Sequence, residues 1–312
     1  ILKHILKRIQ YNIELMITGE KFKGLGVAMI TPFEKDGSID YAALGKMIDY
    51  VIDGGVGYIV ALGTTAETPT LYIPERVAIA DFVKKHVAGR VPLVIGVGGN
   101  STSEVLDQLH EIDLEGADAI LSVTPYYNKP SQEGLYQHFK CVAEASPLPI
   151  ILYNIPGRTG VNMLPETTLR IAHDFKNVIG VKEASGNIEQ IARVIDGRDE
   201  GFLVLSGDDG MAVEVMRRGG EGVISVAANL FPVQFGHCIS LAAEGRFDEA
   251  DKAYEPFDGV VKALFAEGNP TGIKCALKAK GLIGGTMRLP LVEGTQALYD
   301  KFSGYIKAYD LH

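Results

Sequence analysis

Lys182 is the residue whose position most strongly suggests covalent chemistry. It directly follows the apolar residues Val178, Ile179 and Val181 and precedes Glu183. An ammonium group is costly to bury unless it loses its proton or finds a partner. A desolvated lysine amine is a nucleophile toward carbonyl carbon and can form a Schiff base. We therefore expect an amine nucleophile here. The alternatives are a side chain that extends to the protein rim, or an ion pair with Glu183.

Two other segments contain groups that bind carboxylates. Residues 63–67 read Gly-Thr-Thr-Ala-Glu, in which Thr64 and Thr65 place two hydroxyls beside consecutive backbone amides. In the alternative reading, one of these threonines only caps a helix. Arg158 lies in the segment 153–160, Tyr-Asn-Ile-Pro-Gly-Arg-Thr-Gly. A guanidinium binds a carboxylate in bidentate fashion, although this residue alone could equally be an ordinary surface arginine.

Three tyrosines accompany these groups. Tyr153 opens the segment that contains Arg158, and Tyr126 and Tyr127 lie together in residues 126–130. Paired loop tyrosines are more often packing or interface residues than acid–base groups. Residues 206–209 and 222–225 offer backbone contacts but no basic group of the kind expected around a sugar phosphate. The pattern therefore argues against a phosphorylated substrate.

Several other kinds of chemistry find little support. The seven histidines show no metal-ligand spacing such as His-Glu-x-x-His, and no Gly-x-Ser-x-Gly elbow indicates a serine hydrolase. Asp208 and Asp209 are adjacent, so they point to opposite faces of a strand and do not form a carboxylate dyad. Cys141, Cys238 and Cys275 are odd in number and lie far apart, which supports neither a disulfide framework nor a zinc ribbon and fits a reducing cytosol.

The elements that must position these groups alternate along the chain. Eight apolar, strand-like runs are separated by helix-forming segments such as 40–53, 75–88 and 102–115. The runs span residues 27–33, 58–63, 92–99, 119–127, 149–156, 178–185, 202–209 and 222–229. This pattern predicts an α/β fold, a (β/α)8 TIM barrel, with reactive groups at the carboxyl ends of the strands. A doubly wound sheet is the competing fold, but residues 96–101, Gly-Val-Gly-Gly-Asn-Ser, lack the third glycine of a dinucleotide fingerprint.

The ends of the chain differ from the barrel region. After residue 229 the pattern predicts only helices, at 233–244, 247–265, 271–280 and 292–308, as a C-terminal helical extension. We therefore expect a leader over residues 1–15, a catalytic barrel over 16–230 and a helical region over 231–312. The leader is basic and apolar, and we expect a non-native or disordered segment before Met16. A short amphipathic targeting helix is the alternative.

Charge and hydropathy narrow the range of partners. The 312 residues have a formal net charge of −9, which opposes a broad nucleic-acid or acidic-membrane surface. No apolar run approaches the ~20 residues needed to cross a bilayer. An anionic small substrate therefore requires a locally positive pocket, which Lys182 and Arg158 could supply.

Five motifs in register resemble the dihydrodipicolinate synthase family of pyruvate-dependent aldolases. They are residues 63–67, 124–130, 153–160, 181–186 and 207–209, and the match extends along essentially the whole chain after Met16. The wider group includes N-acetylneuraminate lyase. Thr65 and the Arg-Thr-Gly sequence at 158–160 favour the synthase branch over the lyase branch. A sugar-acid lyase and a non-catalytic barrel that binds pyruvate or lysine remain the alternative functions.

The resemblance implies a role for each motif. Lys182 would form an iminium with pyruvate, and the derived enamine would add to L-aspartate 4-semialdehyde on the diaminopimelate route to lysine. Tyr153 would transfer protons, linked through Thr64 to Tyr127 of a neighbouring subunit. The groups implied to hold the substrates are Thr65, Gly207 and Ile224 for pyruvate and Arg158 for the semialdehyde. The family implies a cytoplasmic homotetramer built as a dimer of dimers, with no cofactor and no metal.

Two departures from the family pattern have consequences. The first motif usually reads Gly-Thr-Thr-Gly-Glu, so Ala66 adds a methyl group, which a helical backbone would tolerate. Regulated members bind lysine at a dimer interface. The counterparts here are Thr68, Pro69, Ile73, Arg76, Asn100, Glu104 and Tyr126. Ile73 and Arg76 replace histidines of strongly lysine-sensitive members, and Arg76 would repel a lysine ammonium. We therefore expect weak or absent feedback inhibition.

Overall fold

The strands close into a barrel in the order of the sequence. The structure is a computed structural model that describes residues 19–309, so the expected leader over residues 1–15 lies outside the described residues. Within that range the parallel strands pair from β1 to β8, and β8 pairs with β1. They are β1 (Gly24–Ala28), β2 (Tyr58–Ala61), β3 (Leu93–Gly96), β4 (Ala119–Val123), β5 (Ile150–Asn154), β6 (Val178–Glu183), β7 (Leu203–Ser206) and β8 (Gly222–Ser225). The predicted (β/α)8 barrel is confirmed, and the doubly wound sheet is excluded.

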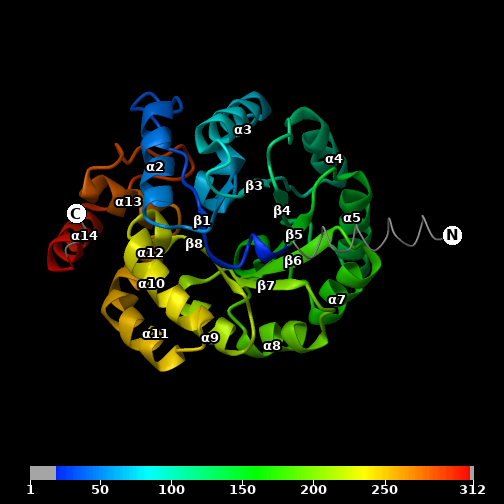
Figure 1. Cartoon of the computed structure of the whole chain (residues 1–312). Helices are drawn as coiled ribbons and strands as arrows, with labels where there is room; N and C mark the ends of the chain where they lie inside the picture. Colours follow the sequence, from blue (N-terminus) through cyan, green and yellow to red (C-terminus); the bar gives the residue numbers. More distant parts are fainter. Residues whose placement is uncertain (1–18, 310–312) are drawn as a thin grey trace.

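A ring of helices surrounds the barrel (Figure 1). Those between the strands are α2 (Tyr41–Asp53), α3 (Ile73–Val87), α4 (Thr102–Glu111), α5 (Gln132–Ala145), α6 (Pro156–Thr159), α7 (Pro165–Asp174), α8 (Ile188–Gly197) and α9 (Ala212–Arg217). Those after β8 are α10 (Pro232–Ala243), α11 (Phe247–Tyr254), α12 (Asp258–Ala266), α13 (Thr271–Lys280) and α14 (Gln296–Ala308). Short 3₁₀ helices are η1 (Thr64–Ala66), η2 (Thr68–Thr70), η3 (Asp209–Met211), η4 (Ala227–Asn229) and η5 (Glu255–Phe257).

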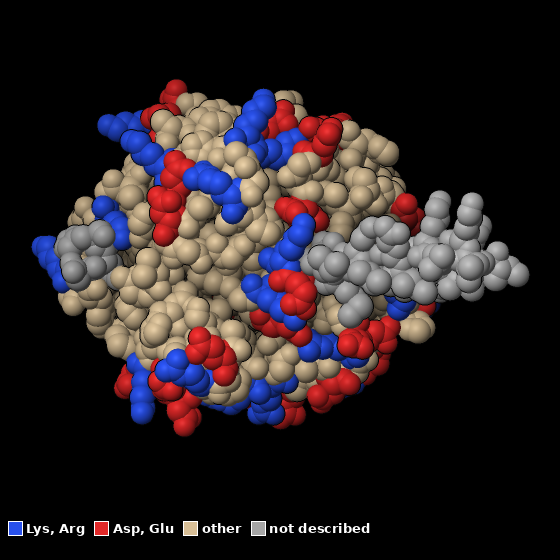
Figure 2. Space-filling model, viewed as in Figure 1, with Lys and Arg blue, Asp and Glu red and all other residues tan. Residues whose placement is uncertain are grey.

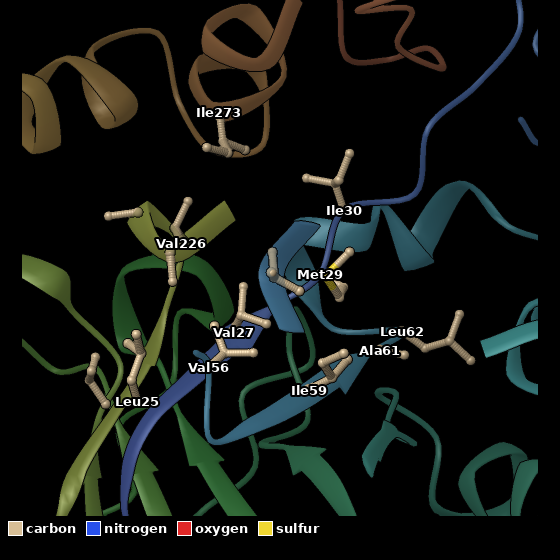
Figure 3. Close-up of a cluster of buried hydrophobic side chains, with 14 of the residues drawn as sticks. Leu25, Val27, Met29, Ile30, Val56, Ile59, Ala61, Leu62, Val226 and Ile273 are labelled. Carbon is tan, nitrogen blue, oxygen red and sulfur yellow. The ribbon is translucent and has the colours of Figure 1, made fainter. Parts of the chain in front are cut away.

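Two buried apolar layers hold the barrel together. The inner layer fills the barrel with side chains that include Tyr58, Val94, Ile151 and Leu205. Phe22, just before β1, packs edge-on against Tyr58 with ring centroids 5.4 Å apart. A larger outer layer lies between strands and helices, and Figure 3 shows part of it. Because each strand has side chains in both layers, its residues are apolar almost without interruption.

Several predicted boundaries differ from the structure. β1 ends at Ala28, so the first predicted strand, 27–33, begins too late and includes residues that leave the sheet before Pro32. The predicted helix 247–265 is two helices, α11 and α12, separated by η5, which contains Pro256. The last helix starts at Gln296 rather than at residue 292. Thr295 is its N-cap, and the Thr295 side chain accepts a hydrogen bond from the Leu298 amide. Proline and capping chemistry explain these shifts.

The helices after β8 pack on the barrel rather than apart from it. Ile273 of α13 shares the outer layer with Ile30, which follows β1, and Val226, which follows β8 (Figure 3). In Figure 1, α13 and α14 lie on the same side of the molecule as α2. The division into regions 16–230 and 231–312 stays a prediction.

The surface mixes charges of both signs. On the face shown in Figure 2, blue and red side chains are interspersed, and neither forms a broad continuous area. None of the helices between residues 19 and 309 is both long and apolar enough to cross a bilayer.

Candidate active site

Lys182 and Tyr153 lie side by side inside the barrel mouth. They are register partners on β6 and β5, and both side chains are buried. The Lys182 Nζ lies 4.4 Å from the centroid of the Tyr153 ring. Lys182 is only 5% exposed, so it does not extend to the rim. The structure thus places a buried amine against a phenol.

Glu183 does not pair with Lys182, so that alternative is wrong. Its carboxylate accepts hydrogen bonds from the Asn154 side chain (3.1 Å), the Ser185 amide (2.8 Å) and the Gln190 side chain (3.3 Å). Burial raises the pKa of Glu183, and these hydrogen bonds oppose the rise. The amide partners hold the ends of β5 and β6 together behind Lys182 and Tyr153.

Gly207 leaves the space that the lysine side chain occupies. It follows β7, and its amide donates to the Glu183 carbonyl oxygen at 2.8 Å. A Cβ at this position would lie 2.6 Å from the Ala184 Cβ and 3.1 Å from the Lys182 Cε. A side chain here would therefore displace the amine.

We expect Gly207→Ala to slow turnover by about 10- to 100-fold, because the added methyl overpacks the site and moves Lys182. Steady-state kinetics with matched melting curves would measure this. Gly210→Ala is the control, because its Cβ would make only ordinary contacts, the nearest at 3.4 Å. Equal activity of the two variants would contradict the expected role of the space at Gly207.

The two threonines lie in η1, directly after β2. Gly63 occupies the N-cap position, and no side chain caps this turn, so neither Thr64 nor Thr65 acts as a helix cap. Thr65 is buried, and its Oγ1 accepts a hydrogen bond from the Asn269 side chain at 3.1 Å.

Ala66 has the right-handed backbone of a 3₁₀ helix, and the positive φ falls on Glu67 instead. The methyl group of Ala66 therefore requires no glycine conformation.

Arg158 lies in α6, at the same end of the barrel. It is exposed, yet its Nη2 donates to the Asn269 carbonyl oxygen at 2.7 Å, so one end of the guanidinium is anchored. A cavity of about 260 Å³ is lined by Thr64, Tyr153 and Arg158. The structure therefore brings three predicted site residues to one cavity, whose lining includes Tyr153, the neighbour of Lys182, but neither Lys182 nor Thr65.

Tyr127 and Ile224 lie apart from this cavity. Tyr127 has a positive φ of 74° and is 86% exposed, and its amide donates to the Thr159 carbonyl oxygen at 3.2 Å. Thr64 and Tyr153 line the cavity, whereas Tyr127 does not. Ile224 is buried on β8 and pairs with Gly26 of β1. The exposed Tyr127 side chain is thus accessible to groups outside its own barrel.

Comparison with known proteins identifies the family. Residues 21–309 match the model of the Dihydrodipicolinate synthetase family. The chain belongs to this family. The 4-hydroxy-tetrahydrodipicolinate synthase of Parabacteroides distasonis is 53% identical over 279 residues, which are 89% of this chain and 94% of that protein.

Solved structures of dihydrodipicolinate synthases share this fold. The enzyme from Thermotoga maritima has a TM-score of 0.91 at 39% identity, covering 94% of this chain and all of that chain. The chloride-inhibited enzyme from Acinetobacter baumannii, complexed with pyruvate, has a TM-score of 0.90 at 38% identity, covering 93% and 99%. The predicted family is confirmed.

Four of the seven residues predicted as counterparts of the family's lysine site lie together. The same 260 Å³ cavity is lined by Thr68, Pro69, Arg76 and Tyr126, so it extends from Thr64, Tyr153 and Arg158 to this set. Arg76 donates to the carbonyl oxygens of Leu71 and Thr68, each at 3.0 Å. Burial lowers the pKa of Arg76, while the charges of Tyr126 and Glu104 oppose that shift.

The other three members of the set do not line this cavity. Ile73 begins α3, Glu104 is exposed in the first turn of α4, and the Asn100 carbonyl oxygen accepts from the Asn128 side chain at 2.9 Å.

Sequence reasoning missed the residues that link this site to the C-terminal helices. Lys274 of α13 forms a fully buried ion pair with Glu67, which also accepts from the Arg288 amide at 3.1 Å. Asn269 contacts Thr65 and Arg158. Glu67 belongs to the predicted motif 63–67, but no local signal marks Asn269 or Lys274. Their partners Thr65 and Glu67 lie 204 and 207 residues earlier in the chain.

Asp209 has a structural environment of its own. It is buried, and its carboxylate accepts from the amides of Val226 (3.1 Å) and Ala227 (3.0 Å), at the start of η4. Burial raises its pKa to about 6. Asp208 instead accepts from the Gly210 amide, so the two carboxylates have separate partners and form no dyad. No group of three or more potential metal ligands occurs in residues 19–309.

Proposed function

We propose that this chain condenses pyruvate with L-aspartate 4-semialdehyde and that Lys182 forms the covalent bond to pyruvate. The chain is a lyase, and its relatives are named 4-hydroxy-tetrahydrodipicolinate synthase. The observation that supports the role of Lys182 is its buried amine, 4.4 Å from the Tyr153 ring. A non-catalytic barrel would have no need to exclude water from a lysine amine at the barrel mouth.

The lysine divides one difficult carbon–carbon bond formation into easier steps. The lone pair of Nζ attacks the keto carbon of pyruvate, and the keto oxygen leaves as water to give an iminium. Loss of a methyl proton converts the iminium into an enamine. The enamine carbon then attacks the aldehyde carbon of the second substrate, whose oxygen takes up a proton. Attack by the amino group of that substrate on the former keto carbon closes the ring and releases Lys182.

Tyr153 is our proposed proton carrier for these steps. Its phenol lies on the strand next to Lys182, within reach of groups bound to the amine. In this proposal Thr64, which lines the same cavity, passes the proton onward to Tyr127 of a second subunit. The 86% exposure of Tyr127 supports a role outside its own barrel. A homotetramer built from such dimers is therefore our proposed assembly, and sedimentation analysis would test it.

Two sets of groups would hold the two carboxylates. We assign the pyruvate carboxylate to the Thr65 hydroxyl, because an acceptor-only carboxylate requires a donor. We assign the rest of the bound pyruvate to the backbone at Gly207 and Ile224. We assign the semialdehyde carboxylate to Arg158, which is anchored through Nη2 and keeps further N–H groups available.

The described cysteines are free thiols, which agrees with the cytoplasmic location that we propose.

A direct test combines turnover with chemical trapping. Purified protein with both substrates should form the heterocyclic product, and borohydride with pyruvate alone should reduce the iminium to a stable adduct on Lys182, located by peptide mass spectrometry. Turnover of N-acetylneuraminate without turnover of the semialdehyde would replace the proposal with the sugar-acid lyase. A protein that binds pyruvate without turnover or adduct would be a non-catalytic barrel.

We expect lysine to inhibit this protein weakly or not at all, because the Arg76 cation repels the lysine ammonium in the counterpart of the family's lysine site. Initial rates measured against lysine concentration would check this. The double variant Ile73→His/Arg76→His, which removes the fixed charge, should be more sensitive than the wild type. Half-inhibition of the wild type by micromolar lysine would overturn the expectation.

A further inference from the structure

Asn269 touches both of the side chains to which we assign substrate carboxylates. It lies between α12 and α13 and is only 7% exposed. Its Nδ2 donates to the Thr65 Oγ1 at 3.1 Å, and its carbonyl oxygen accepts from the Arg158 Nη2 at 2.7 Å. One residue outside the barrel strands thus bridges the loop after β2 and the helix after β5.

The direction of the first hydrogen bond decides what Thr65 can offer a ligand. A threonine hydroxyl has one proton and two lone pairs. Because the Asn269 amide donates to Oγ1, the hydroxyl proton of Thr65 is left to donate elsewhere. A carboxylate accepts such a proton and cannot donate one at neutral pH. The contact therefore leaves the Thr65 hydroxyl free to act as a donor, which is what a bound carboxylate requires.

The opposite orientation of the Asn269 amide would remove this property. Its Oδ1 is buried and has no hydrogen-bond partner among residues 19–309. If the amide were rotated by half a turn, Oδ1 would face Thr65 and take the hydroxyl proton. In either orientation one end of the amide lies in a buried space without a partner, so the two orientations differ in the contact that they make with Thr65.

The surroundings hold Asn269 firmly in this position. The Lys274 amide donates to the Pro270 carbonyl oxygen at 3.0 Å, at the start of α13. One turn further, the Lys274 ammonium pairs with Glu67, two residues after Thr65. The same two segments are therefore tied together twice, once through an amide and once through a buried ion pair.

We propose that Asn269 is a positioning residue that sets the donor direction of Thr65 through its side chain and the place of Arg158 through its backbone. This inference rests on the function proposed above. Its distinctive consequence is a separation of effects between the two substrates, since side-chain substitution removes the contact with Thr65 but keeps the carbonyl that holds Arg158.

The test is steady-state kinetics of Asn269→Ala with each substrate varied in turn. We expect KM for pyruvate to rise about 3- to 10-fold, as for the loss of one hydrogen bond, while KM for the semialdehyde changes less than twofold. Asn269→Asp should raise KM for pyruvate further, because its carboxylate accepts the Thr65 proton and repels the ligand. Melting curves would show that both variants fold.

A double-mutant cycle identifies the route of the effect. In a Thr65→Val background, Asn269→Ala should cause no further rise in KM for pyruvate, because the hydroxyl it acts through is gone. Additive effects, an equal rise of both KM values or an unchanged KM for pyruvate would each overturn the inference. If the wild type itself neither turns over nor forms the borohydride adduct, the proposed function fails instead.

Discussion

Lys182→Ala should abolish synthesis of the heterocyclic product and all borohydride labelling with pyruvate. We expect kcat to fall by at least about 10³-fold, which corresponds to about 4 kcal/mol of lost transition-state stabilisation. No other described lysine lies on a barrel strand, so none can replace the amine beside Tyr153. Coupled assays and mass spectrometry would measure the two effects on one preparation.

The matched control removes a lysine that lies outside the barrel. Lys176 is 54% exposed and pairs with Asp199 at 3.1 Å. Lys176→Ala should keep both turnover and labelling. Because Lys182 is buried, circular dichroism must show that Lys182→Ala folds, and Lys182→Met supplies a second variant that fills the space left by the side chain. Retained labelling in the folded Lys182 variants would show that another group forms the adduct.

Removing the Glu67 carboxylate should cause a large loss of stability. Both side chains of the Lys274–Glu67 pair are at most 1% exposed. Burial lowers the pKa of Lys274, and the charge of Glu67 opposes this shift. Breaking a buried ion pair leaves an uncompensated charge in the interior, so we expect Glu67→Ala to cost about 3–5 kcal/mol of unfolding free energy. Thermal and denaturant unfolding would measure it.

Two further variants separate the ion pair from general packing. Glu67→Met/Lys274→Met removes both charges, and we expect it to recover much of the lost stability, because a buried pair is often replaceable by apolar residues. Lys262→Met on α12 breaks an exposed pair, with Lys262 75% exposed, and should change stability by no more than about 0.5 kcal/mol. A loss in Glu67→Ala no larger than that in Lys262→Met would contradict the expectation.

The sequence was sufficient to predict the barrel and the groups at its mouth because both depend on local patterns. Continuous apolar runs mark strands that are buried on both faces, and eight of them in alternation with helices leave few other topologies. Lys182 was recognisable because it directly follows such a run, where burying a charged amine is costly. The two alternatives for Lys182, a rim position and pairing with Glu183, could be excluded only from the fold. Lys182 is buried, and the Glu183 carboxylate accepts from Asn154 of the neighbouring strand instead.

Contacts between distant parts of the chain were beyond prediction. Asn269 and Lys274 belong to a region that the pattern describes only as helical, and their partners, Thr65 and Glu67, lie in the loop after β2. A lone lysine on a helix normally faces solvent, so the burial of Lys274 could not be predicted from the sequence. The strand and helix ends near Pro32 and Pro256 were also missed, because apolar composition continues past the residues at which the backbone turns.

The bridge from Asn269 to Thr65 also affects how the protein matures as it is synthesised. The loop that we assign to pyruvate leaves the ribosome early, whereas its partner is translated 204 residues later. A nascent chain that has already completed all eight strands would still lack Asn269 and Lys274. We therefore expect ribosome-bound intermediates to acquire barrel-like protease resistance before they acquire pyruvate binding, so that folding and competence for chemistry are separate events in time.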